Sequence, residues 1–234
     1  MVVSKIFVNI LIMKNTLTIP QNILDQIKES KELVKKAKYR EALKIIERLH
    51  KKYPKNAYVT FRYAVQYGDQ IVSGFDKKAT HYKRGAAKLL KPLLKRMKEI
   101  PFEERIALRN EYYWFSSQPK KQFLLGKSVV KSDPRGNYSL GVGAWCIARN
   151  YALSGKPVLA KRWANRSCIA WLEYFKYRPD YYNAWSWYAR PLGYLGQNSE
   201  MKQALTKAMK LSGKPITFLE FQEVINDNKT LLSK

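Results

Sequence analysis

The feature that most constrains the fold is a hydrophobic period of three to four residues that recurs along most of the chain. After residue 20, the polar–apolar alternation typical of strands is scarce, whereas apolar residues recur at helical spacing. Proline or glycine follows many of these segments, as at Pro54, Pro101, Gly155 and Gly196, and ends a helix there. The pattern predicts an all-α protein made of antiparallel helical hairpins.

The helical segments can be placed by this period and its stops. The predicted segments are a hairpin over 23–52, then 57–71, 79–100, 102–115, 119–131, 140–153, 158–177, 181–195, 201–211 and 218–232. Pro92 should kink or divide the segment 79–100. The stretch 132–137 is dense in turn residues and is the best internal boundary. We therefore expect an N-terminal apolar segment (1–22), hairpins with a basic helix (23–131), this boundary (132–137), and hairpins with a capping helix (138–234).

Three of the hairpins carry residues in the pattern of a known repeat. These residues are Tyr39, Ala42, Ile46, Leu49 and Pro54 in the first, Ile147, Ala148, Tyr151, Gly155 and Ala160 in the third, and Trp185, Tyr188, Ala189, Leu192, Gly196, Leu205 and Ala208 in the fourth. The pattern resembles the tetratricopeptide repeat (TPR) family, whose hairpins of about 34 residues stack into a solenoid. The resemblance covers roughly 23–71 and 138–212, with gaps.

The resemblance implies an α-solenoid of roughly four hairpins plus a C-terminal capping helix, acting as a binding platform. Gly155 and Gly196 fall one step past a helix end, where a left-handed backbone is expected. These two glycines lie 41 residues apart rather than 34, and Pro191 lies inside a helix. We therefore expect an irregular solenoid.

The chain is strongly basic. It has 234 residues, with 44 Lys plus Arg against 18 Asp plus Glu, so its formal charge is +26. Its hydrophobic content of 46% is too high for a disordered basic tail. A surface that is merely soluble mixes both signs, and uncompensated charge repels itself, so we expect an anionic partner.

The charge is concentrated in two acid-poor stretches. Residues 77–98 hold nine Lys or Arg and no acid, and residues 135–190 hold nine against Glu173 and Asp180. In the first stretch one helical stripe forms a predicted basic surface, opposite a leucine face. Its members are Arg84, Lys88, Lys91 and Lys95.

The second stretch is interleaved with aromatic residues. Trp187, Arg190 and Tyr194 share one helix face, and Trp145 and Arg149 share another. The resemblance directs these positions into a concave groove, where Arg and aromatic side chains suit peptide anchors or stacked bases. For Trp145 and Trp187 a place in the core fits the sequence equally well.

Some TPR proteins clamp a partner's terminal carboxylate with Lys, Arg and Asn side chains. The cations that could contribute here are Lys28, Lys31, Lys35, Arg62, Arg149 and Arg190. The matching asparagines are not at the positions that such a clamp requires.

The sequence offers little for catalysis. Gly141-Val142-Gly143 is too short a signal for a phosphate loop, and Glu103-Glu104 is better explained by the dipole of the helix that follows. Cys146 and Cys168 fit buried apolar positions, while the two histidines, His50 and His81, fit surface faces next to lysines. We expect no enzymatic activity, cofactor, metal or small-molecule substrate.

The amino terminus allows several interpretations. Residues 6–13 are apolar, but eight residues cannot span a bilayer, which needs about 20. They loosely resemble an export signal without a cleavage site, and they also fit a structural element or an over-extended start before Met13. We expect a cytoplasmic protein, with export the less favoured alternative.

Fold resemblance and charge together predict a non-enzymatic adaptor or scaffold that holds an acidic protein or peptide, as part of a larger complex. Two alternatives stay open at this point. One is an RNA-binding subunit of a ribonucleoprotein assembly, and the other is a peripheral protein on an anionic membrane.

Overall fold

A computed structural model describes residues 19–35, 38–68, 79–212, 224, 226 and 228–232. Within these ranges the chain is helical and contains no strand, as predicted. The α-helices are α2 (Gln21–Lys35), α3 (Tyr39–Lys52), α4 (Ala57–Gly68), α5 (Ala79–Leu93), α6 (Arg105–Phe115), α7 (Pro119–Val129), α8 (Gly136–Leu153), α9 (Pro157–Tyr177), α10 (Tyr182–Tyr194) and α11 (Asn198–Ser212). The apolar segment 6–13, the end of the predicted segment 57–71 and most of the predicted helix 218–232 lie outside the described residues.

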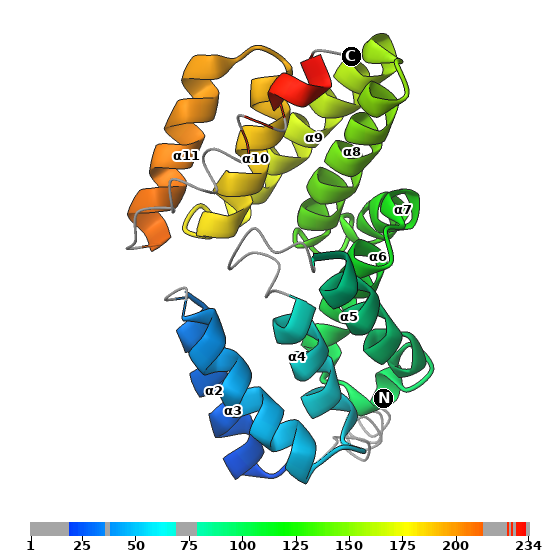
Figure 1. Cartoon of the computed structure of the whole chain (residues 1–234), viewed down its shortest axis with the longest axis vertical. Helices are drawn as coiled ribbons and strands as arrows, with labels where there is room; N and C mark the ends of the chain where they lie inside the picture. Colours follow the sequence, from blue (N-terminus) through cyan, green and yellow to red (C-terminus); the bar gives the residue numbers. More distant parts are fainter. Residues whose placement is uncertain are drawn as a thin grey trace, which may run out of the picture.

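Each α-helix packs against the next along the chain, and the helices follow a curved path (Figure 1). In addition, α4 contacts α6, and α8 contacts α10. The path brings distant segments together at α10. The hydroxyls of Tyr39, at the start of α3, and Tyr182, at the start of α10, lie 2.9 Å apart. The rings of Trp114 on α6 and Trp187 on α10 meet edge to face, with their centroids 5.0 Å apart.

The two predicted left-handed glycines are confirmed. Gly155 follows α8 with φ +67° and Gly196 follows α10 with φ +80°. In both turns the amide one residue further on closes the helix end. Lys156 N–H donates to Tyr151 C=O at 2.9 Å, and Gln197 N–H donates to Leu192 C=O at 3.0 Å.

The predicted helix 79–100 is too long at its C-terminal end. Helix α5 ends at Leu93, directly after Pro92, and a turn leads to a 3₁₀ helix, η3 (Met97–Glu99). The Arg96 guanidinium donates to both Glu99 carboxylate oxygens, at 2.7 and 2.6 Å, and to the Lys55 carbonyl at 2.8 Å. These bonds stabilise the turn in which the chain changes direction after α5. Residues 102–104 likewise form a 3₁₀ turn, η4 (Phe102–Glu104), before α6 begins.

The predicted boundary at 132–137 is a turn between two closely packed helices, and its last two residues, Gly136 and Asn137, already belong to α8. Small residues allow α7 and α8 to approach closely. A Cβ added at Gly143 would lie 2.7 Å from the backbone nitrogen of Phe123, and one at Gly126 would lie 2.6 Å from that of Leu140. The glycines of α8 are therefore packing residues rather than part of a phosphate loop.

A buried polar group also joins this region. The side-chain oxygen of Asn110 on α6 accepts hydrogen bonds from Gln122 of α7 at 2.9 Å and Ser139 of α8 at 2.8 Å. All three residues are buried. Because unpaired buried polar groups are unfavourable, these bonds define how the three helices fit together. None of the helices in the described ranges is long and apolar enough to cross a membrane.

Candidate anion-binding surfaces

Exposed side chains are few on α4, α6, α8 and α10, and many on α2, α3, α5, α7, α9 and α11. Every residue of α4 and α10 is buried or half-buried, and on α8 only Asn150 and Leu153 are exposed. The odd-numbered helices (α3, α5, α7, α9 and α11) each present a broad exposed face. This difference follows from the packing, because α4 contacts α6 and α8 contacts α10, in addition to their neighbours in sequence.

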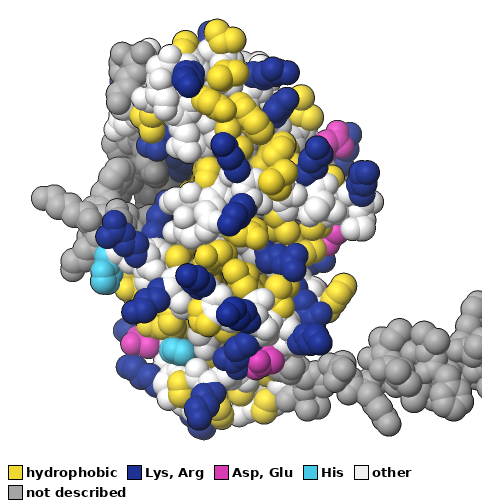
Figure 2. Space-filling view, turned by 90° about the vertical axis from the view of Figure 1, so that its right-hand side faces the viewer, with side chains coloured by type: hydrophobic (Ala, Val, Ile, Leu, Met, Phe, Trp, Pro, Cys, Tyr) yellow, Lys and Arg dark blue, Asp and Glu magenta, His cyan; other side chains and the backbone are white. Residues whose placement is uncertain are grey.

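Lys and Arg residues are also more numerous on the odd-numbered helices than on the even-numbered ones. The odd-numbered helices together carry nineteen Lys or Arg and four Asp or Glu, whereas the even-numbered helices (α2, α4, α6, α8 and α10) carry eight and four. In the view of Figure 2, Lys and Arg side chains spread over the whole face and Asp and Glu are few. Hydrophobic side chains gather between the cations in the upper half of that view.

The predicted basic surface is on the exterior. Arg84, Lys88, Lys91 and Lys95 are all exposed, and none forms an ion pair with a described residue. Lys95 lies in the turn after α5 rather than on the helix. The neighbouring Arg96 differs, because its ion pair with Glu99 at 2.6 Å gives it a structural role. The surface is therefore a short exposed row of cations for which the described residues supply no counter-charge.

The predicted groove residues separate into two groups. Trp145 and Tyr194 are 2% and 3% exposed, and their ring centroids lie 6.2 Å apart in a cluster with Ala148, Ala160 and Leu231. This burial places both aromatic side chains in the core and corrects their assignment to a partner-binding surface. The reason is that α9 and α10 both pack on α8, so the two rings meet between these helices.

The other groove residues are half-buried and lie partly in an aromatic–cation cluster. The Arg190 guanidinium lies 5.1 Å from the Trp187 ring centroid, and Trp187 meets Trp114 edge to face. The Lys83 ammonium lies 4.2 Å from the Trp114 centroid. Arg149 is half-buried on α8. Trp114 and Lys83 were not among the predicted groove residues, because no short-range spacing links α5 and α6 to α10.

Two cations considered for a carboxylate clamp already bind a carboxylate of this chain. Glu104 in η4 pairs with Lys31 of α2 at 2.6 Å and with Arg62 of α4 at 3.8 Å. The Tyr58 hydroxyl donates to the same carboxylate at 3.2 Å. Burial alone would raise the pKa of Glu104, but Arg62, Lys31 and the Tyr58 hydroxyl outweigh it, so the pKa is lowered. Glu104 thus has a structural role beyond its favourable place before α6.

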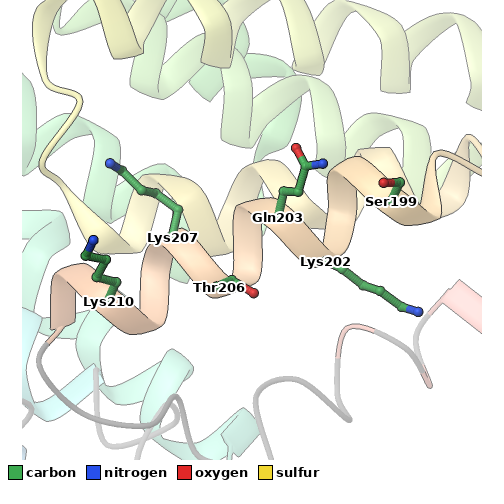
Figure 3. Close-up of a pocket in the computed structure, with 6 residues that line it drawn as sticks. All are labelled: Ser199, Lys202, Gln203, Thr206, Lys207 and Lys210. Carbon is green, nitrogen blue, oxygen red and sulfur yellow. The ribbon is translucent and has the colours of Figure 1, made fainter.

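Two shallow depressions also lie on odd-numbered helices. One follows α11 and is lined by Ser199, Lys202, Gln203, Thr206, Lys207 and Lys210. Figure 3 shows Gln203, Lys207 and Lys210 rising on the same side of α11, while Lys202 points away from them. The other follows α3 and is lined by Lys44, Glu47, Arg48 and Lys51. Both are rich in cations, which matches the charge of the odd-numbered helices.

The potentially reactive side chains lie in structural settings. Burial raises the pKa of the Cys168 thiol to about 12, so the reactive thiolate is disfavoured at neutral pH. His50 is half-buried rather than exposed, stacks on Tyr63 with ring centroids 4.6 Å apart, and has its pKa lowered by burial. Among the residues that the structure describes, no three His, Cys, Asp or Glu side chains gather as metal ligands would.

Comparison with known proteins adds no assignment: no family model matches the chain, and no curated protein matches it significantly.

Proposed function

We propose that the protein is a non-enzymatic, TPR-like helical-repeat adaptor that holds an acidic protein partner within a larger complex. The observation that carries the proposal is the uneven charge, with nineteen cations and four acids on the odd-numbered helices. A surface charged in this way attracts an anionic partner and disfavours association with basic surfaces. The structural roles of Glu104 and Cys168 support the non-enzymatic part of the proposal.

The partner contacts the odd-numbered helices and not the groove predicted around Trp145 and Trp187. Exposed apolar side chains lie among the cations there, with Leu124 60%, Ile169 62% and Leu172 51% exposed. Such side chains contribute to binding when they are buried against apolar groups of a protein. Phosphate groups of a nucleic acid offer no comparable contact, so this combination favours a protein partner.

RNA is the second candidate, favoured by the row Arg84, Lys88, Lys91 and Lys95 on α5 and the turn after it. No large apolar side chain is exposed between these cations. Because Trp145 and Tyr194 are core residues, an RNA complex here would rest mainly on phosphate contacts. Its affinity would then fall by roughly one log unit per log of salt for each phosphate neutralised.

The test compares two labelled probes, a polyglutamate peptide and a single-stranded RNA of equal length, titrated with the full chain. A variant with the exposed cations Lys121, Lys127, Lys161 and Arg162 of α7 and α9 all replaced by Gln should bind the peptide more weakly. The matched control exchanges Arg and Lys at the same four positions and keeps the charge, so it should bind as the wild type does. Tight RNA binding without peptide binding would contradict the proposal and favour the second candidate.

A further inference from the structure

Helix α9 carries an exposed stripe with the spacing of a helix–helix contact. Its members follow one another by four and three residues in turn, and all are exposed: Val158, Arg162, Asn165, Ile169, Leu172 and Lys176. The opposite face of α9 is buried and includes Ala164, Ser167 and Trp171. The stripe spans about 27 Å at about 1.5 Å of rise per residue. We call these six residues the α9 stripe.

The apolar members of the stripe are largely exposed to solvent, although the opposite face of the same helix is buried. Val158 is 80%, Ile169 is 62% and Leu172 is 51% exposed. Single exposed apolar residues are common on protein surfaces, but these three lie on one line of α9, with Ile169 and Leu172 adjacent and the polar Arg162 and Asn165 between them and Val158.

The charges around the stripe restrict what can cover it. Four cations lie on α9, namely Lys161, Arg162, Arg166 and Lys176. The one acid on this helix, Glu173, is paired with Lys176 at 2.6 Å. A second copy of this chain would bring like charges together along the stripe, which is unfavourable. An acidic partner would neutralise them.

The neighbouring helix α7 extends the same chemistry. The ring of Phe123 on α7 meets that of Trp163 on α9 at 5.0 Å, and the Arg166 guanidinium lies 4.6 Å from the Trp163 centroid. Beside Phe123, α7 exposes Leu124 and the cation Lys127. The surface around the stripe is therefore both apolar and basic.

We propose that the α9 stripe docks an amphipathic α-helix of an acidic protein. The apolar face of that helix, with residues at three- and four-residue spacing, covers Val158, Ile169 and Leu172. Its flanking Glu or Asp residues face Arg162 and Arg166. This assignment rests on the proposed adaptor function and names the place and form of its contact.

The experiment measures binding of the full chain to a labelled 21-residue helical peptide, with leucine at three- and four-residue spacing and glutamate beside it. The double variant Ile169→Ser, Leu172→Ser should weaken binding about tenfold or more. The control is Phe102→Ser, which removes an exposed apolar side chain of η4 (79% exposed) and should bind as the wild type does. Circular dichroism confirms that both variants remain folded.

Several results would overturn the assignment. If the stripe variant and Phe102→Ser weaken binding equally, or if the stripe variant binds normally, α9 is not the docking site, although an acidic partner could still bind elsewhere. If neither this peptide nor polyglutamate binds, the adaptor function fails as well. Loss of dimers, of RNA binding or of phosphatidylserine vesicle binding in the stripe variant alone would assign the stripe to another occupant.

Discussion

Glu104 connects three segments that are far apart in the sequence, because its carboxylate binds Lys31 of α2 together with Arg62 and Tyr58 of α4. From the sequence, the dipole of α6 accounts for an acid just before this helix, and it accounts for Glu103 as well as for Glu104. Only the folded chain distinguishes the two, since Glu103 is exposed and the Glu104 side chain is 13% exposed. Long-range pairing of this kind leaves no trace in local spacing.

The prediction at this scale concerns Glu104→Gln, which keeps the side-chain shape but removes the charge. It should lower the free energy of unfolding at neutral pH by about 2 kcal/mol or more, because Lys31 and Arg62 lose their partner. The pKa of Glu104 is lower in the folded state than its usual value of 4.5. Its ionised form therefore stabilises the fold above pH 4.5, and this contribution is lost as the pH falls through the lowered pKa.

Urea unfolding of the wild type and the variant at several pH values measures this effect. The difference between the two proteins should be full at pH 7 and should shrink towards zero in acid. The exposed neighbour provides the control, because Glu103→Gln should change stability little at any pH. A Glu104→Gln variant as stable as the wild type at pH 7 would show that the ion pairs add nothing.

The aromatic residues show a second limit at the residue scale. Helical spacing groups Trp145 with Arg149, and Trp187 with Arg190, but it does not say which face of a helix is covered. Helices α9 and α10 pack around Trp145 on α8, so Trp145 is core, whereas Trp187 is half-buried beside Trp114. Whether an aromatic side chain is buried therefore depends on neighbouring helices, which come from other parts of the chain.

At the scale of elements, local rules predicted the helices well and their ends less well. Gly155 and Gly196 mark the ends of α8 and α10 because their positive φ is accessible to glycine. Proline inside a helix is less decisive. Pro92 is followed by the end of α5, but α10 continues past Pro191 to Tyr194. The spacing of the α9 stripe could have been found in the sequence, but the exposure of its residues could not.

The prediction for elements concerns the close contact of α7 and α8. In Gly143→Ala the new Cβ would meet the backbone nitrogen of Phe123 at 2.7 Å, so one helix must move. We expect a loss of about 1–3 kcal/mol, because this strain exceeds the gain of about 1 kcal/mol that alanine brings to a helix.

Gly85→Ala in α5 is the matched control for thermal unfolding. Its new Cβ meets the side chain of Tyr67, at 2.6 Å from a ring carbon, rather than a backbone. A ring at the end of a side chain can turn aside, so the Tm should fall less than for Gly143→Ala. Equal losses in the two variants would show that the contact of α7 and α8 is not specially intolerant of a Cβ.

At the scale of the whole molecule, the order of helices follows from the sequence, and the TPR resemblance leads to the expectation of a stacked array. The contacts of α10 with α3 and α6 were not predictable, because Tyr39 and Tyr182 are 143 residues apart. The charge of +26 is evident from composition, but its concentration on the odd-numbered helices requires knowledge of which helices are exposed. The fold thus converts a global charge into a property of particular surfaces.

That distribution predicts how salt affects the free protein. Cations on adjacent exposed faces repel one another, and raising the salt from about 0.01 M to about 0.15 M shortens the screening length from about 30 to about 8 Å. Screening should therefore raise the Tm, by about 2–4 °C for each kcal/mol of repulsion removed. A variant with Gln at 84, 88, 91 and 95 lacks four of the charges, so its Tm should start higher at low salt and rise less. Calorimetry of both proteins decides: a wild-type Tm that falls with added salt would mean that attractive ion pairs, such as those of Glu104, outweigh the repulsion among the exposed cations.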